Sequence, residues 1–200
     1  MLKNVVFDFG QVLVRFDPSY MVGQFVKEEE DAELLANVLF DRLYWDRLDA
    51  GTILDSEVVE DACRRLPERL HAVASEIYYA WIYNLPPIDG MEALVKELKA
   101  RGVRLCLLSN ISTYFAKHAD EIPVLTHFDR CVFSAVCGHV KPSREIFAHL
   151  CEVCELLPEE TVFVDDNAAN IAGAEAFGIK GYLFDGDAER LRKHLMLALK

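Results

Sequence analysis

The feature that most constrains this chain is a stretch near its start, Asn4-Val5-Val6-Phe7-Asp8-Phe9-Gly10-Gln11-Val12-Leu13. A short apolar run rich in β-branched residues ends in one carboxylate, Asp8, and a second apolar run follows Gly10. The first run is typical of a buried strand, and ligands of open α/β sheets bind beyond the carboxyl ends of such strands. The stretch therefore predicts a strand that delivers Asp8 to a ligand crevice. A carboxylate there is a metal ligand, a nucleophile or both, or it merely caps a turn.

The later part of the chain alternates predicted strands and helices. Strands are expected over 103–108, 130–133, 161–164 and 179–184, and helices over 112–119, 143–153, 167–176 and from 188 onwards. A further helix is expected after Asp89, which we predict as its N-cap, and it should end before Gly102. Strands that alternate with helices of this length imply right-handed crossovers, and hence a parallel sheet covered on both faces.

Between the first strand and this alternating part lies a stretch that needs no strand. After an extended connection over 11–16, Asp17-Pro18 is typical of a helix start. Apolar residues then follow a helical spacing, with Asp55 or Ser56 as the N-cap of one helix, until Leu85-Pro86-Pro87 stops the pattern. We therefore predict an α/β core over 1–16 and 87–200, and a helical insert over 17–86.

Composition narrows the class of protein. The 200 residues, 52% of them hydrophobic and 27% charged, suit one globular domain, or one domain with an insert. No apolar run reaches membrane-spanning length, and no signal peptide is recognisable, so a cytoplasmic location is expected. The net charge of −12 argues against nucleic acid and anionic membranes as partners. The six cysteines fit reduced thiols, and nothing specifies an oligomeric state.

Polar residues follow four of the predicted strands. They are Asp8, the pair Ser109-Asn110, Lys141, and the pair Asp165-Asp166. Each has an ordinary explanation, since such residues often form turns, solvated surfaces or helix caps. Their joint occurrence at the carboxyl ends of successive strands is much less expected by chance, and it predicts one site along one edge of the sheet.

With these four segments the chain resembles the haloacid dehalogenase superfamily of hydrolases, over essentially all of its length. The matching segments are Val5-Val6-Phe7-Asp8-Phe9-Gly10 for the nucleophile motif, Leu107-Leu108-Ser109-Asn110 for the phosphate-binding motif, Val140-Lys141-Pro142 for the lysine motif and Val162-Phe163-Val164-Asp165-Asp166-Asn167 for the acidic motif. The resemblance implies a Rossmann-like parallel sheet, and the insert over 17–86 is similar to the family's helical C1 cap. Within the superfamily the chain is most similar to small sugar-phosphate phosphatases of the α-glucose-1-phosphate phosphatase kind.

The resemblance implies a role for each residue. Asp8 would attack the phosphorus of a phosphate ester and form a phospho-aspartyl intermediate. A Mg²⁺ ion would be held by Asp8, the backbone carbonyl of Gly10 and Asp166. Asp165 would support these ligands or replace one of them, and Asn170 could hold a metal-bound water. The Ser109 hydroxyl and the Asn110 backbone N–H would bind phosphoryl oxygens, while Lys141 would neutralise developing charge and restrain Asp8.

One position departs from the phosphatase pattern. Most phosphatases of the family carry a second Asp where this chain has Gly10, and that Asp protonates the leaving alcohol. General acid–base catalysis contributes about 10²–10⁴-fold to the reaction rate, so the replacement of this Asp by Gly10 matters for activity. Haloacid dehalogenases lack this Asp too, but they work without metal and lack the paired Asp165-Asp166.

Three functions follow in order of preference. The first is a Mg²⁺-dependent phosphoric monoester hydrolase acting on a small phosphorylated metabolite, such as a sugar phosphate. The others are a metal-independent dehalogenase and a catalytically weak protein that binds a phosphate ligand. The helical insert should select the substrate, and six of its residues are candidates for facing the site: Tyr44, Trp45, Asp46, Arg47, Tyr78 and Trp81.

Overall fold

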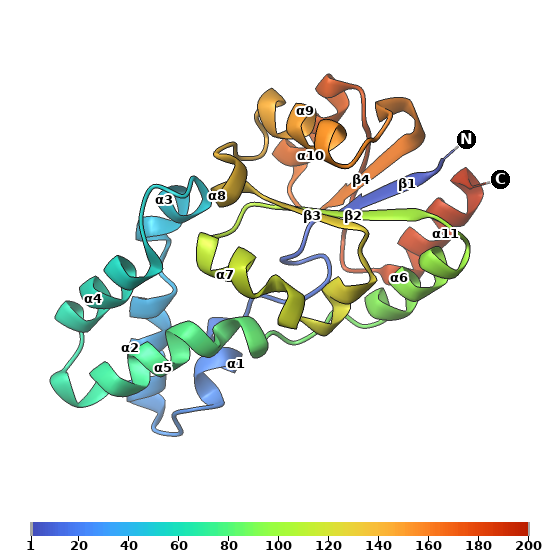
Figure 1. Ribbon diagram of the computed structural model, residues 1–200. Helices are drawn as coiled ribbons and strands as arrows, with labels where there is room; N and C mark the ends of the chain where they lie inside the picture. Colours follow the sequence, from blue (N-terminus) through green and yellow to red (C-terminus); the bar gives the residue numbers. More distant parts are fainter. Residues whose placement is uncertain (1, 200) are drawn as a thin grey trace.

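A computed structural model describes residues 2–199, and its centre is a parallel sheet (Figure 1). Over these residues the sheet has five strands in the order β3-β2-β1-β4-β5. The strands are β1 (Asn4–Phe7), β2 (Arg104–Ser109), β3 (Arg130–Phe133), β4 (Thr161–Asp165) and β5 (Lys180–Leu183). The predicted parallel α/β sheet is confirmed, and the strand that carries the first motif lies at its centre.

Helices cover both faces of the sheet, as predicted (Figure 1). On one face lie α6 (Met91–Ala100), α7 (Thr113–His118) and α11 (Ala188–Ala198), and on the other α9 (Arg144–Val153) and α10 (Ala168–Phe177). Side chains of β1 alternate between the two faces: Val5 and Phe7 pack into the first hydrophobic core, and Val6 packs into the second. This double burial explains why β1 is an unbroken apolar run.

A separate group of helices, which we call the helical unit, lies to one side of the sheet (Figure 1). It consists of α1 (Pro18–Gly23), α2 (Glu29–Leu39), α3 (Trp45–Asp49), α4 (Asp55–Arg65) and α5 (His71–Ala80), with 3₁₀ turns at Arg42–Tyr44, Glu68–Leu70 and Trp81–Tyr83. It has its own hydrophobic core, in which Leu35 and Ile77 are fully buried. The domain boundaries at 17 and 86 stay a prediction.

The two segments that join the helical unit to the sheet lie beside each other. The Arg15 N–H donates to the Pro86 carbonyl at 2.8 Å, and the Ile88 N–H donates to the Leu13 carbonyl at 3.0 Å. Between these bonds, Val14 and Pro87 form an antiparallel bridge. The chain reaches this pairing through a turn at Gln11, whose φ is +57°, so the expected extended connection over 11–16 is wrong at its start.

Two of the expected helix caps are also wrong. The N-cap of α6 is Gly90, with φ +83°, and not Asp89. Asp55 is the first residue of α4, and the N-cap Leu54 instead donates its N–H to Glu57 at 2.9 Å. The Asp55 carboxylate is buried, and a buried carboxylate needs donors, so its side chain turns toward hydroxyl groups of other elements.

Among residues 2–199, no helix combines the length and the apolar character that a membrane crossing requires.

Candidate active site

The register of the sheet brings the predicted site residues together. Phe7 pairs with Leu107 on one side and with Val164 on the other. Asp8, which follows β1, is therefore level with the end of β2 and with Asp165 at the end of β4. The predicted convergence at one edge of the sheet thus results directly from strand pairing.

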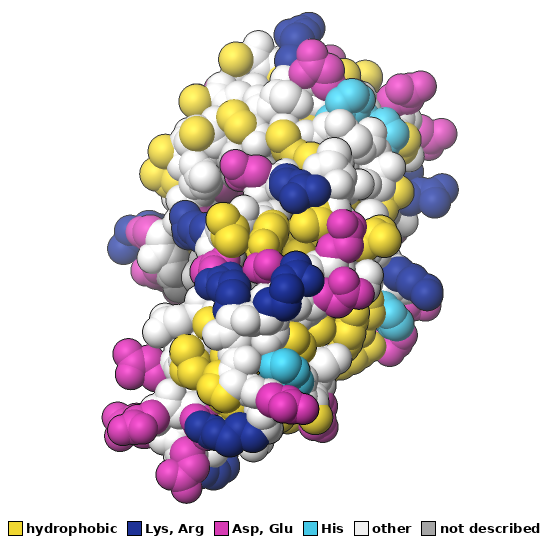
Figure 2. Space-filling view, turned by 90° about the vertical axis from the view of Figure 1, so that its left-hand side faces the viewer, with side chains coloured by type: hydrophobic (Ala, Val, Ile, Leu, Met, Phe, Trp, Pro, Cys, Tyr) yellow, Lys and Arg dark blue, Asp and Glu magenta, His cyan; other side chains and the backbone are white. Residues whose placement is uncertain are grey.

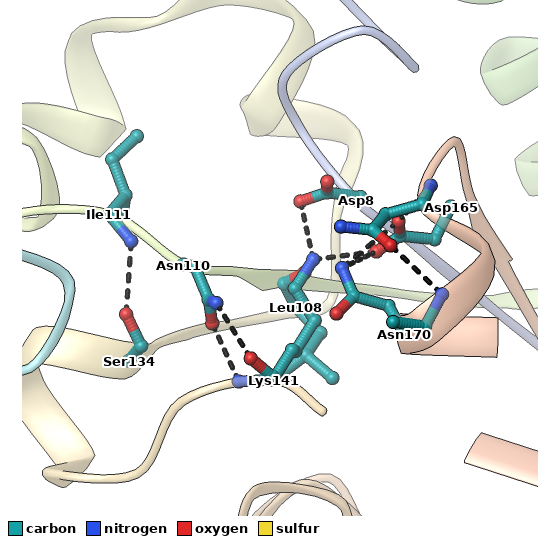
Figure 3. Close-up of polar contacts among 10 residues, drawn as sticks. Asp8, Leu108, Asn110, Ile111, Ser134, Lys141, Asp165 and Asn170 are labelled. Atoms are coloured by element: carbon teal, nitrogen blue, oxygen red, sulfur yellow. Dashed lines mark hydrogen bonds and ion pairs between the residues drawn. The ribbon is translucent and has the colours of Figure 1, made fainter. Parts of the chain in front are cut away.

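Lys141 is the centre of the site's polar contacts (Figure 3). Its Nζ lies 2.8 Å from Asp8 Oδ1 and 2.8 Å from Asp165 Oδ2, and it donates to the Leu108 carbonyl at 3.0 Å. Burial by itself would lower the pKa of Lys141, but the Asp8 and Asp165 carboxylates outweigh burial and raise it. Lys141 is therefore a fixed positive charge that holds Asp8 in place.

Asn110 positions the loop that carries Lys141 (Figure 3). Its side-chain amide donates to the Lys141 carbonyl at 3.1 Å and accepts from the Lys141 N–H at 2.8 Å. The next residue, Ile111, donates its N–H to the Ser134 hydroxyl at 3.0 Å. Ser109 lies at the end of β2, and its buried side chain lines the cavity described below. The Asn110 side chain thus has a positioning role that the sequence did not suggest.

Asp165 is held from several directions. It is fully buried and accepts hydrogen bonds from Lys141, from the Asn170 amide at 3.0–3.1 Å and from the Asn167 N–H at 2.8 Å. Asn170 directs its amide N–H group at Asp165 (Figure 3), and its expected contact with a metal-bound water stays a prediction. These contacts suit a residue that supports the site.

Three carboxylates of the site can face one cation. Asp8, Asp165 and Asp166 each offer an oxygen atom, and these atoms lie within 4.8 Å of one another. Burial raises the pKa of Asp8 to about 6, an effect that Lys141 opposes and Asp165 reinforces. Partial burial, with the neighbouring Asp165 carboxylate, also raises the pKa of Asp166. A group of like charges made only of oxygen donors fits a hard cation such as Mg²⁺.

A cavity of about 490 Å³ lies between the sheet edge and the helical unit, and it has the size of a small-molecule site. On the sheet side, Asp8, Gly10, Ser109, Asn110, Lys141, Asp166 and Asn170 line it. Of the six candidates from the helical insert, Tyr44, Trp45, Asp46, Tyr78 and Trp81 line it as well. Arg47 does not line it and is exposed, so that expectation is wrong.

Several lining residues were not predicted as site residues from the sequence, among them Phe16, Phe40, Arg42, Asp49, Asp55 and Arg65. Phe16 makes edge contacts with three other rings: its centroid lies 5.8 Å from that of Phe40, 5.2 Å from Trp45 and 5.9 Å from Trp81. Trp81 also stacks on Phe115 of the core. No motif connects these residues, because only the packing of the helical unit on the core brings them together.

Asp55 joins the helical unit to the core at the cavity wall. Its carboxylate accepts a hydrogen bond from the Tyr78 hydroxyl at 3.2 Å and another from the Ser112 hydroxyl at 3.0 Å. Ser112 is also the N-cap of α7, and its oxygen accepts from the Phe115 N–H at 3.4 Å. One hydroxyl therefore serves both the start of a core helix and the contact with the helical unit.

Known proteins resemble this chain over nearly its whole length. It is 27% identical to a D-ribitol-5-phosphate phosphatase from Bacteroides thetaiotaomicron, over 94% of this chain and 95% of the relative. It is also 27% identical to a sesquiterpene phosphatase from Aspergillus oryzae, over 90% and 88% of the two chains.

Solved structures share the fold. A HAD-like family hydrolase from Porphyromonas gingivalis superposes with a TM-score of 0.74 at 23% identity, over 100% of this chain and 99% of the other. A HAD family enzyme from Bacteroides thetaiotaomicron, in complex with magnesium and inorganic phosphate, superposes with a TM-score of 0.70 at 22% identity, over 96% and 99%.

The model of one hydrolase family, described as haloacid dehalogenase-like hydrolase, matches residues 2–178. The match spans β1, the helical unit and all the predicted site residues. This chain therefore belongs to the haloacid dehalogenase-like hydrolase family.

Proposed function

We propose that this chain is a Mg²⁺-dependent phosphatase that hydrolyses a small phosphorylated metabolite through a phospho-aspartyl intermediate. The observation that carries the proposal is the arrangement of Asp8, Lys141 and the Asp165-Asp166 pair at adjacent strand ends, facing one cavity. Two relatives that match most of the chain are named as a D-ribitol-5-phosphate phosphatase and a sesquiterpene phosphatase, which supports the same reaction.

The residues of the sheet edge fit the chemical demands of phosphoryl transfer. Asp8 is the nucleophile, and Lys141 restrains it while offsetting the negative charge that gathers on the phosphoryl oxygens. The Ser109 hydroxyl and the Asn110 backbone N–H are assigned to phosphoryl binding, because both lie beside Asp8 at the cavity wall.

We assign the metal to Asp8, the Gly10 carbonyl and Asp166, with Asp165 as a supporting or alternative ligand. Three carboxylates beside a single lysine leave a surplus of negative charge, which a divalent cation would offset. When bound, Mg²⁺ would reduce the repulsion between the Asp8 carboxylate and an anionic phosphate.

We further propose that the helical unit is a cap that selects the leaving group. Its side of the cavity presents aromatic rings from Trp45 and Trp81, which pack against Phe16 of the connecting segment, together with charged groups such as Arg42. The cavity wall from the helical unit thus mixes apolar rings with charged groups, and the outer face of the molecule drawn in Figure 2 shows a similar mixture of basic, acidic and apolar side chains. Such walls suit one small, mostly apolar or cyclic leaving group better than a polymer.

Phosphate release from a panel of phosphorylated metabolites tests the proposal. We expect Mg²⁺-dependent release that EDTA abolishes and that added Mg²⁺ restores. Release of halide from a 2-haloacid, unaffected by EDTA, would instead show that the chain is a dehalogenase. This alternative is worth testing because part of the chain matches a known dehalogenase. That relative, a (S)-2-haloacid dehalogenase from Pseudomonas sp., is 33% identical over only 40% of this chain and 36% of its own length. Binding of phosphate esters without turnover would overturn both enzymatic assignments.

A further inference from the structure

The proposed phosphatase reaction needs a proton donor that the first motif does not supply. When Asp8 displaces an alcohol, the leaving oxygen must gain a proton, and the residue two positions after Asp8 is Gly10. A side chain elsewhere in the cavity is therefore required if esters of ordinary alcohols are substrates.

Six carboxylates line the cavity, and four of them are already engaged. Asp8 and Asp166 belong to the oxygen cluster at the sheet edge. Asp41 accepts from the Leu43 N–H and pairs with Arg65 at 2.5 Å, and Asp55 accepts from Tyr78 and Ser112. Asp46 and Asp49, both from α3, complete the set.

Asp46 and Asp49 differ in their surroundings. Asp46 is exposed to solvent, whereas Asp49 is half-buried. Within residues 2–199, the Asp49 side chain has neither a hydrogen-bonding partner nor an ion-pair partner. Burial raises the pKa of Asp49 to about 6, Lys141 opposes the rise, and Asp46 and Asp8 add to it. Asp49 lines the same cavity as Asp8 and Lys141, so a substrate bound there can contact all three side chains.

The turn that carries Asp49 is fixed in place. The N–H groups of Ala50, Gly51 and Thr52 donate to backbone carbonyls of α3 at 3.1, 3.0 and 2.8 Å. Gly51 has φ +68°, and a Cβ built on it would lie 2.4 Å from the Ala135 carbonyl oxygen in α8 (Ser134–Cys137). Figure 1 shows α3 next to α8. The missing side chain at position 51 thus lets the helical unit rest directly on the core beside Asp49.

We propose that Asp49 is the general acid and base of this reaction, replacing the carboxyl that Gly10 lacks. The proposal rests on the proposed phosphatase function. In the first step Asp8 bonds to phosphorus, the bond from phosphorus to the ester oxygen breaks, and that oxygen takes the proton of the Asp49 carboxyl. In the second step the Asp49 carboxylate takes a proton from a water molecule, whose oxygen bonds to phosphorus. The bond from phosphorus to the Asp8 oxygen breaks and its electron pair returns to the Asp8 carboxylate, so that inorganic phosphate is released and Asp49 is protonated again.

Two substrates with the same aromatic body but different leaving groups test this assignment. The phenol released from 4-nitrophenyl phosphate is acidic and needs no protonation, whereas the alcohol released from 4-nitrobenzyl phosphate does. For Asp49→Asn we expect kcat/KM for the benzyl ester to fall about 10²–10⁴-fold, while that for the phenyl ester stays within about threefold. Retention of activity toward the phenyl ester also shows that the variant is folded.

The second step gives an independent readout. With 4-nitrophenyl phosphate, Asp49→Asn should release a burst of nitrophenol equal to the enzyme concentration, followed by slow turnover, because water activation is lost.

Asp46→Asn is the matched control, since it removes the same charge from the same helix. We expect its kcat/KM values for the two esters to change by the same factor. A built Cβ at Gly10 has no atom within 4 Å, so Gly10→Asp in the Asp49→Asn background should restore activity toward the benzyl ester.

Each outcome has a distinct meaning. An equal loss on both substrates, or no loss on the benzyl ester, would overturn the role of Asp49 and leave the proposed function standing. If wild-type enzyme releases phosphate from neither ester nor from any phosphorylated metabolite, the proposed function fails, and this inference fails with it.

Discussion

The two walls of the cavity are held in different ways. On the core wall, Asp165 is fully buried, and Lys141 and Asn170 fix both of its oxygens. On the wall from the helical unit, Trp45 is half-buried and is positioned by edge contacts between rings and by Arg42, 4.9 Å from its ring centre. Hydrogen-bonded charges tolerate little displacement, whereas ring packing can be rebuilt around other shapes. We infer that the core wall holds the attacking group and the metal ligands, whereas the wall from the helical unit selects the leaving group and, through Asp49, exchanges protons with it.

The comparison of the two walls predicts that the largest loss of activity follows substitution of Asp8, the proposed nucleophile on the core wall. Asp8→Asn keeps the shape of the side chain but removes its charge and most of its nucleophilicity, so kcat should fall by about 10⁴-fold or more. Phosphate release under saturating substrate measures this, with the thermal midpoint as a check that the fold is kept. Residual activity within about tenfold of wild type would rule out Asp8 as the nucleophile.

A second prediction separates the paired acids of the core wall. Asp165→Asn places an amide N–H group opposite Lys141 or Asn170, so the free energy of unfolding should fall on the order of 3 kcal/mol. Asp166 is exposed, so Asp166→Ala should change that free energy by less than about 0.5 kcal/mol while removing Mg²⁺ binding. Urea unfolding and calorimetric Mg²⁺ titration measure the two effects. The reverse pattern would exchange the roles assigned to the two residues.

Substitutions in the cavity wall from the helical unit should change substrate binding more than the rate of turnover. Trp45→Ala removes a ring that lines the cavity and contacts Phe16, so KM should rise about tenfold, with kcat changed less than about threefold. Tyr20→Ala is the matched control, since this aromatic residue of the helical unit is 46% exposed and does not line the cavity. A large loss of kcat in Trp45→Ala would show that the Trp45 ring itself affects the chemical step, beyond the role proposed for Asp49 of the same wall.

The smallest predicted effect concerns the contact between the walls. Ser112→Ala removes both the N-cap of α7 and the bond to Asp55, so stability should fall by about 1–2 kcal/mol. Ser143→Ala is the control: Ser143 is the N-cap of α9, but its buried hydroxyl has no partner within residues 2–199. Urea unfolding should show little loss for that variant. Equal losses of stability in the two variants would mean that the hydrogen bond from Ser112 to Asp55 adds nothing to the free energy of unfolding.

The difference between the core wall and the wall from the helical unit also explains which parts of the site the sequence could predict. The strands were predictable because buried parallel strands are continuous apolar runs, and the core residues of the site because each follows such a strand. Asp55 was expected as an N-cap, because local sequence cannot show that Tyr78 and Ser112 would surround it. Asp49 carried no signal at all, since its relevance depends on Gly51 resting against Ala135, a contact between distant segments.

The pairing of Val14 with Pro87 has a consequence for how such a protein can change. The helical unit leaves and rejoins the core through two segments that are hydrogen-bonded to each other, so its two ends lie at one point of the core. A different insert whose ends are equally close could be spliced in at this junction without altering the strand order that holds Asp8, Lys141 and Asp165. Evolution or a protein engineer could therefore exchange the helical unit as one piece and keep the nucleophile and metal ligands of the core, provided that the new insert supplies a proton donor in place of Asp49.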